Sequence, residues 1–168
     1  MNEKPYIMNE NNLLLLNLPE YNFKIIKDEN NTYIFDELRK KNVVLTPEEW
    51  VRQNFVKYLI NELNYPKGLM SLEYPFSMNK TNKRSDIVIF NKDNNVIAIV
   101  ECKAPNVKLD AKSFEQIAIY NLHLKTNILI LTNGLLHFCW YIDHEKNVKK
   151  FLKRIPRYDE IIDDSFYL

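Results

Sequence analysis

Two carboxylates and a lysine lie at the ends of two apolar segments. Asp86 precedes Ile87–Phe90, and Glu101 and Lys103 follow the end of Val96–Val100. If these segments pair as antiparallel strands through the Asn-rich turn between them, the start of one lies beside the end of the other and the three side chains converge. Carboxylate oxygens bind Mg²⁺, and an ammonium group orients an attacking water and offsets charge on a phosphate. The spacing therefore indicates a divalent-metal site for phosphodiester hydrolysis.

The same residues also fit a surface ion-pair cluster, because charged side chains at strand ends are normally solvated. The segment before Glu101 favours the metal site. Ile97–Val100 is apolar on both faces of the expected strand, which indicates a buried strand. Glu101 and Lys103 then lie at its end and not along an exposed edge strand.

A helix is predicted upstream of these strands. Thr46 can act as N-cap, Pro47 occupies the first helical position, and Glu49 at N3 completes a capping box. Apolar residues at helical spacing continue to Leu63, and the sequence 64–68 ends the pattern.

Hydrophobic periodicity and turn residues set the other elements. The expected order is α-β-β-β-α-β-β after an N-terminal β-hairpin. The elements are a hairpin of 23–26 with 33–35, strands at 72–76, 86–90 and 96–100, a helix at 113–121, and strands at 127–131 and 136–142.

The composition is that of one compact globular domain. The chain has 168 residues, of which 46% are hydrophobic and 12% aromatic. Its only glycines are Gly68 and Gly134, so the sequence contains neither the G-x-G-x-x-G fingerprint nor a P-loop motif. Rossmann dinucleotide binding and P-loop ATP hydrolysis are excluded, and we expect no nucleotide cofactor.

Charge, cysteine content and hydropathy limit the expected partners and the expected cellular location of the protein. The net charge of +1 means that any anionic partner must be met by local charge. Two cysteines cannot build a disulfide framework, and Cys102 lies in an apolar run, which favours buried reduced thiols and a cytoplasmic location. The apolar stretch near the start is far shorter than the roughly 20 residues of a membrane span, so no membrane partner is expected. The basic run 146–157 is either a solvated face or a phosphate track.

Several short motifs, in order, resemble a known family. Arg84–Phe90 followed by Val100–Pro105 resembles the PD-(D/E)xK nuclease motif. Leu45–Gln53, together with Thr132–Gly134, is similar to the N-terminal nuclease domain of type I restriction enzyme R subunits and its short stand-alone relatives. One position departs from the pattern: Ser85 stands where the motif's name implies proline, which shapes the backbone and carries no ligand.

The resemblance covers about residues 34–140 and implies an α/β fold with a restriction-endonuclease-like core. In that fold a central mixed β-sheet is flanked by helices. The expected divisions are an N-terminal extension with the β-hairpin (1–40), the nuclease-like core (41–145), and a basic then acidic C-terminal segment (146–168) packed on or trailing the same domain. The implied activity is cleavage of DNA that depends on Mg²⁺ or Mn²⁺.

The resemblance also assigns roles to residues near the strand ends. It implies that Asp86 and Glu101 bind the metal, that the backbone carbonyl of Cys102 faces the ion, and that Lys103 assists the attacking water.

Family members also use a glutamate from the first helix. The spacing of Glu48 and Arg52 matches this motif better than Glu49, whose capping-box role is already explained. The alternative for Glu48 is an ordinary i,i+4 surface pair with Arg52.

The expected DNA contacts come from three places. Gln116 and Tyr120 share a helix face and match the Q-x-x-x-Y element of related nucleases, although a polar helix face with a half-buried tyrosine is an equal alternative. Lys83 and Arg84 lie on an expected loop entering Asp86, and Arg52 lies on the first helix.

Two functions of different classes follow. The first is a metal-dependent DNA endonuclease with a restriction or DNA-processing role. The second is a catalytically silent DNA-binding or partner-recruited module with the same fold. Beside DNA, the expected partner is a second copy of the chain or a recruiting subunit. R subunits couple cleavage to an ATP-driven motor, whereas this chain has no phosphate-binding glycine loop, so we expect it to act without ATP.

Overall fold

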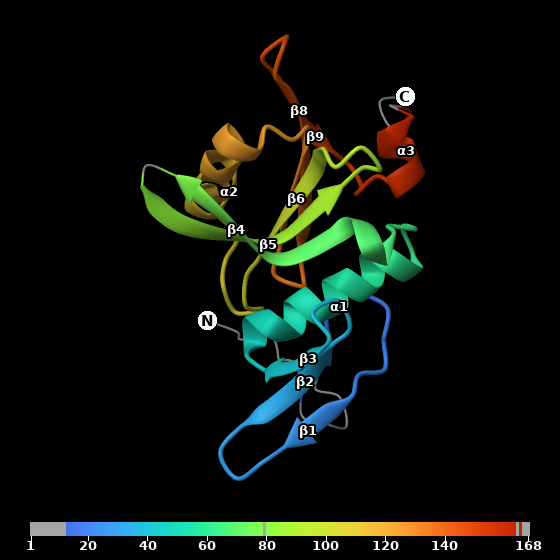
Figure 1. Cartoon of the computed structure of the whole chain (residues 1–168), viewed down its shortest axis with the longest axis vertical. Helices are drawn as coiled ribbons and strands as arrows, with labels where there is room; N and C mark the ends of the chain where they lie inside the picture. The colour runs from blue at the N-terminus through green and yellow to red at the C-terminus, as the bar shows by residue number, and fades with distance from the viewer. Residues whose placement is uncertain (1–12, 79, 164, 166–168) are drawn as a thin grey trace, which may run out of the picture.

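A six-stranded mixed sheet forms the centre of the computed structural model, which describes residues 13–78, 80–163 and 165 (Figure 1). Its strand order follows the chain, and all neighbours are antiparallel except β6 and β7, which are parallel. A helix, α2 (Ala111–Leu124), makes the crossover that a parallel pair requires. The strands are β4 (Met70–Met78), β5 (Thr81–Phe90), β6 (Val96–Cys102), β7 (Ile128–Thr132), β8 (His137–Asp143) and β9 (Val148–Leu152).

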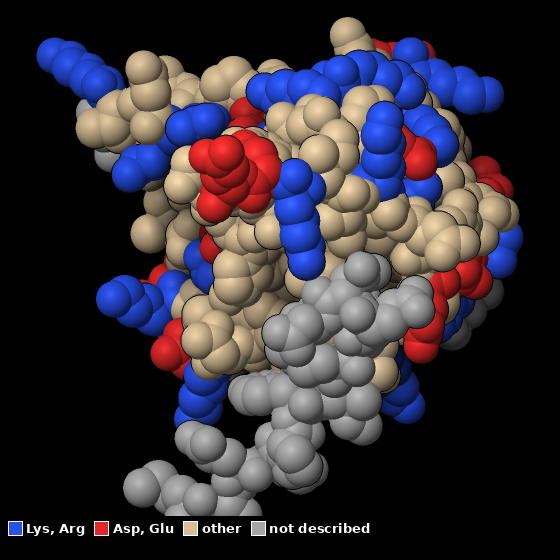
Figure 2. Space-filling model, turned by 90° about the horizontal axis from the view of Figure 1, so that it is seen from below, with Lys and Arg blue, Asp and Glu red and all other residues tan. Residues whose placement is uncertain are grey.

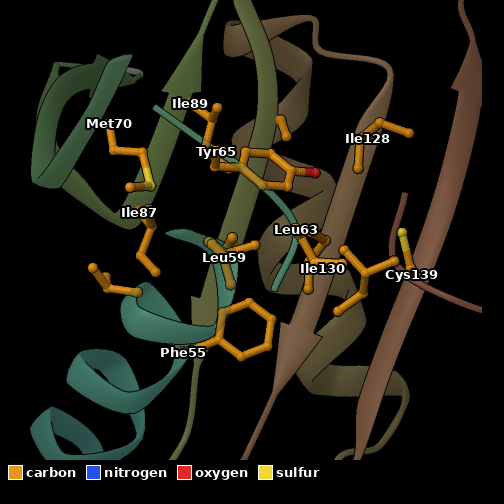
Figure 3. Close-up of a cluster of buried hydrophobic side chains, with 14 of the residues drawn as sticks. Phe55, Leu59, Leu63, Tyr65, Met70, Ile87, Ile89, Ile128, Ile130 and Cys139 are labelled. Carbon is orange, nitrogen blue, oxygen red and sulfur yellow. The ribbon is translucent and has the colours of Figure 1, made fainter. Parts of the chain in front are cut away.

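Helices cover both faces of this sheet because its central strands are apolar on both sides. One face packs against α1 (Pro47–Asn61), where Phe55 and Leu59 meet Ile87 and Ile130 (Figure 3). The other face packs against α2, whose Ile117 is buried against alternate strand residues, Val88, Ile99 and Leu129. Short elements complete the first face: the 3₁₀ turn η1 (Lys67–Leu69) and the helix α3 (Tyr158–Ile162). The predicted central mixed sheet flanked by helices is confirmed.

The first helix begins where the sequence predicts, but its cap differs. Thr46 Oγ1 accepts a hydrogen bond from the Glu49 amide at 3.0 Å, and Pro47 occupies the first turn. The reciprocal half of the capping box is absent from the contacts of these two residues: the Thr46 amide donates to the Val44 carbonyl, and the Glu49 carboxylate binds arginines instead. Charge-assisted bonds to a guanidinium are stronger than a return to the cap amide, which explains why the capping-box prediction was wrong.

The N-terminal hairpin is confirmed and carries an unpredicted third strand. The strands β1 (Ile25–Lys27), β2 (Thr32–Asp36) and β3 (Lys41–Val44) form an antiparallel sheet in that order. Figure 1 shows this small sheet below α1, with the large sheet on the other side of the helix. Gln53 Nε2 of α1 donates to Asp36 Oδ2 of β2 at 2.8 Å, and this hydrogen bond links the helix to the small sheet.

The hairpin of β4 and β5 corrects one further prediction, and the opposite edge of the sheet holds a strand that was not predicted. Lys83 and Arg84 lie within β5, opposite Phe76 and Pro75 of β4, and not on a loop. The polar run 81–85 has no apolar alternation, so only its partner strand reveals it. The basic segment contributes β9, an additional strand that pairs with β8.

The cysteines and the helices bear on two further expectations from the sequence, a buried free thiol and the absence of a membrane span. Cys102 is free and buried, as predicted, and Cys139 is free and buried as well. Among the described residues, no helix combines the length and the hydropathy needed to cross a membrane.

Candidate active site

The predicted pairing of β5 with β6 brings the charged residues together. Ile87 lies opposite Val100, so Asp86 comes just before this pair on β5 and Glu101 just after it on β6. The Cys102 amide donates to Asp86 Oδ2 at 2.7 Å, and Lys103 Nζ donates to Glu101 Oε1 at 2.8 Å. The two carboxylates and the lysine therefore meet where the two strands diverge.

Glu101 is the most buried acid of this group, with a fractional exposure of 4%. Burial, and secondly the nearby charge of Asp86, raise its pKa to about 7, against the opposing effect of Lys103. Its second oxygen, Oε2, is buried and makes no hydrogen bond to any described residue. A buried carboxylate oxygen without a partner is costly, and an incoming cation would satisfy it.

A glutamine on α2 completes the surroundings of the lysine. Asp110 caps α2 by accepting from the Ser113 amide at 3.0 Å, and the helix then directs Gln116 toward the strand ends. Gln116 Oε1 accepts from Lys103 Nζ at 3.0 Å. Gln116 Nε2 lies 2.5 Å from Glu101 Oε1 and 3.1 Å from the Tyr120 hydroxyl.

Gln116 and Tyr120 therefore share a face, as predicted, and this face points at the site. Burial lowers the pKa of Lys103, but the hydrogen bond to Glu101 and the charges of the nearby acids together raise it above its ordinary value. The lysine stays protonated in this arrangement.

The first helix supplies a buried arginine that binds the first carboxylate. Arg52 Nη2 lies 2.6 Å from Asp86 Oδ1 and 3.1 Å from Glu48 Oε1, and Nη1 pairs with Glu49. The Arg52 side chain is 6% exposed, and although burial lowers its pKa, its acidic neighbours, with Asp86 first, together raise it. Arg52, predicted from the sequence to contact DNA, is thus buried and occupied by carboxylates of this chain.

Glu48 lies at the solvent side of this network. It makes the i,i+4 pair with Arg52, and its side chain is 44% exposed. Its pKa is raised by burial and then by the charge of Asp86, so it lies within electrostatic reach of the site. Glu49, set aside in the sequence analysis as a capping residue, is the buried one and holds Arg52 in place.

A second arginine links the small sheet to this network, and sequence reasoning missed it. Arg39, in the turn after β2, pairs with Asp36 Oδ2 at 2.5 Å, Glu49 Oε1 at 2.7 Å and Glu73 Oε2 at 2.7 Å. These acids come from β2, α1 and β4, so no local spacing predicts the cluster. The backbone has a positive φ at Glu73, 48°, where the pairing of β4 with β5 is interrupted, and at Lys40, 55°, directly after Arg39.

The donors suit a hard cation with two carboxylate ligands. Among the described residues, no group of three or more His, Cys, Asp and Glu side chains is arranged to hold a metal ion. Asp86 and Glu101 are the two carboxylates that such an ion would bind, and Glu101 Oε2 makes no hydrogen bond to a described residue. Mg²⁺ commonly binds through one or two carboxylates and leaves its other positions to water and phosphate, so this donor set fits it.

The remaining predicted DNA contacts lie on the β4–β5 hairpin. Lys83 and Arg84 line a shallow hollow with Phe76 and Asn82, and Arg84, whose side chain is 69% exposed, lies 3.8 Å from Glu73. Figure 2 shows basic and acidic side chains interspersed over the face seen from below, in keeping with the small net charge. Any phosphate contact there depends on individual side chains.

The family of the chain follows from a comparison with family models. Residues 47–156, more than half of the chain, match the type I restriction enzyme R protein N terminus (HSDR_N). The chain belongs to this family, which confirms the resemblance found in the sequence.

A solved structure has the same fold. It is a fragment of an HsdR subunit of a type I restriction enzyme from Vibrio vulnificus YJ016, with a TM-score of 0.53 and 22% sequence identity. The match covers 71% of this chain but only 25% of that one. A comparison with curated proteins found no match.

Proposed function

We propose that this chain is a metal-dependent deoxyribonuclease of the PD-(D/E)xK type, with a restriction-endonuclease-like core and a role in restriction or DNA processing. The observation that carries the proposal is the buried, unpartnered Oε2 of Glu101, beside Asp86 and at the same strand end as Lys103. Membership in the R-subunit family supports a nuclease-related role.

The ligand set that we propose is Asp86, Glu101 and the backbone carbonyl of Cys102, with Mg²⁺ or Mn²⁺ as the ion. When bound, a divalent cation supplies charge that stabilises the transferring phosphate and favours ionisation of water. Lys103, held protonated by Glu101 and Gln116, then orients the attacking water and offsets the charge that develops on the phosphate.

Other residues of the site act on the DNA or on these groups. Gln116 positions Lys103 and Glu101, and its amide, together with the Tyr120 hydroxyl, contacts the DNA backbone. Glu48 adds a carboxylate at the solvent side of the site. Lys83 and Arg84 contact phosphates from the exposed hairpin.

A second candidate is a silent DNA-binding or partner-recruited module. Two contacts favour it: Arg52 binds one oxygen of Asp86, and the Cys102 amide binds the other. A carboxylate engaged in this way is a poorer metal ligand than a free one.

Metal binding and DNA cleavage together separate the two candidates. Calorimetry with Mn²⁺, and a linear labelled DNA incubated with Mg²⁺ or Mn²⁺, are applied to the wild type and to three variants. We expect Asp86→Ala and Glu101→Ala to lose metal binding and cleavage together. Lys103→Ala keeps the ion but loses activity by about 100-fold or more, because it removes only charge stabilisation of the transition state.

The matched control is Lys92→Ala, at an exposed lysine in the turn between β5 and β6, which leaves both properties unchanged. Wild-type activity of Lys103→Ala would contradict the catalytic assignment. DNA binding without Mn²⁺ binding or cleavage would support the silent module instead.

A further inference from the structure

Four aromatic side chains form a strip where α2 meets the edge of the large sheet. Phe138 and Trp140 of β8, Phe151 of β9 and Phe114 of α2 make up this aromatic strip. Ring centroids are 4.5 Å apart for Phe114 and Trp140, 5.8 Å for Trp140 and Phe151, and 6.1 Å for Phe138 and Phe151. Phe151 is 54% exposed, although an aromatic ring on a strand normally seeks burial.

The aromatic strip is separate from the candidate active site. Phe114 and Gln116 are two positions apart on α2, about 200° around the helix, so they approach opposite sides of it. Glu101 lies opposite Leu131, and Leu131 lies opposite Phe138. Phe138 is thus two strands away from Glu101, about 10 Å across the sheet.

A groove continues the strip along the hairpin of β8 and β9. It has a volume of about 400 Å³ and is lined by α2 residues, including the exposed Ile119 and Leu122, and by Ile142 and Lys149. Ile142 lies two residues after Trp140, so the two point to the same face of β8. The groove and the strip therefore form one continuous surface.

Two lysines that border this surface form no ion pair with a described residue. Lys149 precedes Phe151 by two residues on the same face of β9, and Lys153 follows the end of the strand. Neither has an ion pair among the described residues, whereas the neighbouring Lys146 and Arg154 are paired with Asp143 and Glu160. The surface thus joins one exposed ring, Phe151, and three half-buried rings to Lys149 and Lys153, while Glu115 and Asp143 line the groove beside them.

We propose that the aromatic strip binds a single nucleic-acid strand, with unpaired bases stacked on Trp140 and Phe151 and phosphates paired with Lys149 and Lys153. Aromatic side chains beside basic ones are the combination that single-strand-binding surfaces use. A duplex hides its base faces and cannot stack on the rings. A protein partner fits less well, because the centres of protein interfaces are depleted in lysine.

The proposal goes beyond cleavage and uses none of the residues of the candidate active site. It is therefore tested in EDTA, where no metal-dependent reaction occurs. The probe is a fluorescent oligothymidylate of about 15 nucleotides, a length within the range of known single-strand sites. Anisotropy gives the affinity, and quenching of tryptophan fluorescence reports stacking on Trp140.

Two variants remove the two kinds of contact. Phe151→Ala, at an exposed position, is expected to weaken binding by about 10-fold, since each stacked base contributes on this order. The double variant Lys149→Gln with Lys153→Gln is expected to lower the slope of log affinity against log salt by about 1.4, for two phosphate contacts to a single strand.

Matched controls lie elsewhere on the chain. Lys150→Gln changes a lysine on the opposite face of β9, and Val44→Ala shortens an exposed apolar residue of β3. Both are expected to bind as the wild type does. Circular dichroism of each variant confirms that the fold is retained.

Three results would overturn the proposal. The first is a wild type that does not bind the oligothymidylate, or variants that bind it with unchanged affinity. The second is an equal effect of Phe151→Ala on a duplex of the same length, which would indicate a general electrostatic patch. The third is self-association in the ultracentrifuge that Phe151→Ala abolishes while single-strand binding is kept, which would assign the surface to a second copy.

Discussion

Glu101 is the acid of the candidate site whose charge costs most stability. Its folded-state pKa of about 7 lies above the ordinary value of 4.5, because burial and Asp86 oppose ionisation. Between these two pH values the folded state binds more protons than the unfolded state, so stability falls as pH rises through this window. The difference corresponds to roughly 3 kcal/mol at most.

We therefore predict that Glu101→Gln raises the melting temperature at pH 8 but not at pH 5, in EDTA. A neutral amide avoids the cost of a buried charge, while Lys103 keeps its bond to Gln116. Thermal unfolding of the variant and the wild type at both pH values measures this. Glu115→Gln, at an exposed position of α2, serves as control. The same difference at both pH values would show that Glu101 does not titrate in this window.

Substitution of the two neighbouring glutamates of α1 is predicted to have different effects, on stability for Glu49 and on cleavage for Glu48. Glu49 is buried between Arg39 and Arg52, so Glu49→Gln breaks two buried ion pairs and destabilises the fold by about 2 kcal/mol or more. Glu48 is half-exposed, so Glu48→Gln changes stability by less than about 1 kcal/mol and acts mainly on cleavage. Urea unfolding and the DNA assay, run on both variants, separate stability from activity. The opposite assignment of effects would mean that Glu49 is the helix residue that serves the reaction.

How much of the site the sequence predicts depends on the range of its contacts. Asp86, Glu101 and Lys103 could be placed together because a short turn joins two apolar strands whose pairing is local. The pairs of Arg39 with Glu73 and of Arg52 with Asp86 could not be predicted, because only the tertiary fold brings these elements together. The buried Glu49 was misjudged for the same reason.

At the scale of elements, the start of α1 governs how the first helix meets the site. Thr46 Oγ1 accepts one amide, and no return bond from Glu49 adds to it. We predict that Thr46→Ala destabilises the protein by about 1 kcal/mol, whereas Thr46→Ser, which keeps the hydroxyl, has little effect. Chemical denaturation of both variants is the measurement. Equal losses in the two would point to the methyl group, and not to the cap bond.

The elements that sequence patterns missed share one property. Clear periodicity gives α1, β6 and β7, which are buried, whereas β3 and β9 are short and mostly exposed. Edge strands often carry lysines, which discourage pairing with other chains and also erase the apolar alternation. The same holds for the outer half of the β4–β5 hairpin, whose polar run 81–85 was assigned to a loop.

The whole molecule has one D…E-x-K set, and this limits the reaction that we propose for it. The chain matches the N-terminal family of R subunits and spans 25% of the HsdR fragment with the same fold. Its own residues include no phosphate-binding glycine loop, so cleavage by this chain has no step in which ATP is bound by such a loop. One set of catalytic groups cuts one strand at a time. Cutting both strands takes two encounters or a symmetric dimer.

We therefore predict that the chain nicks supercoiled plasmid in Mg²⁺ or Mn²⁺, so that open circles accumulate before linear DNA, with or without ATP. Phosphate contacts dominate binding to a duplex, so the rate should fall steeply as salt rises. Gel analysis of a time course decides the order of products, and Lys103→Ala serves as the inactive control. Immediate linearisation at discrete sites would contradict the prediction, because two strands cut in one encounter require two sites held in fixed register, as in a symmetric dimer.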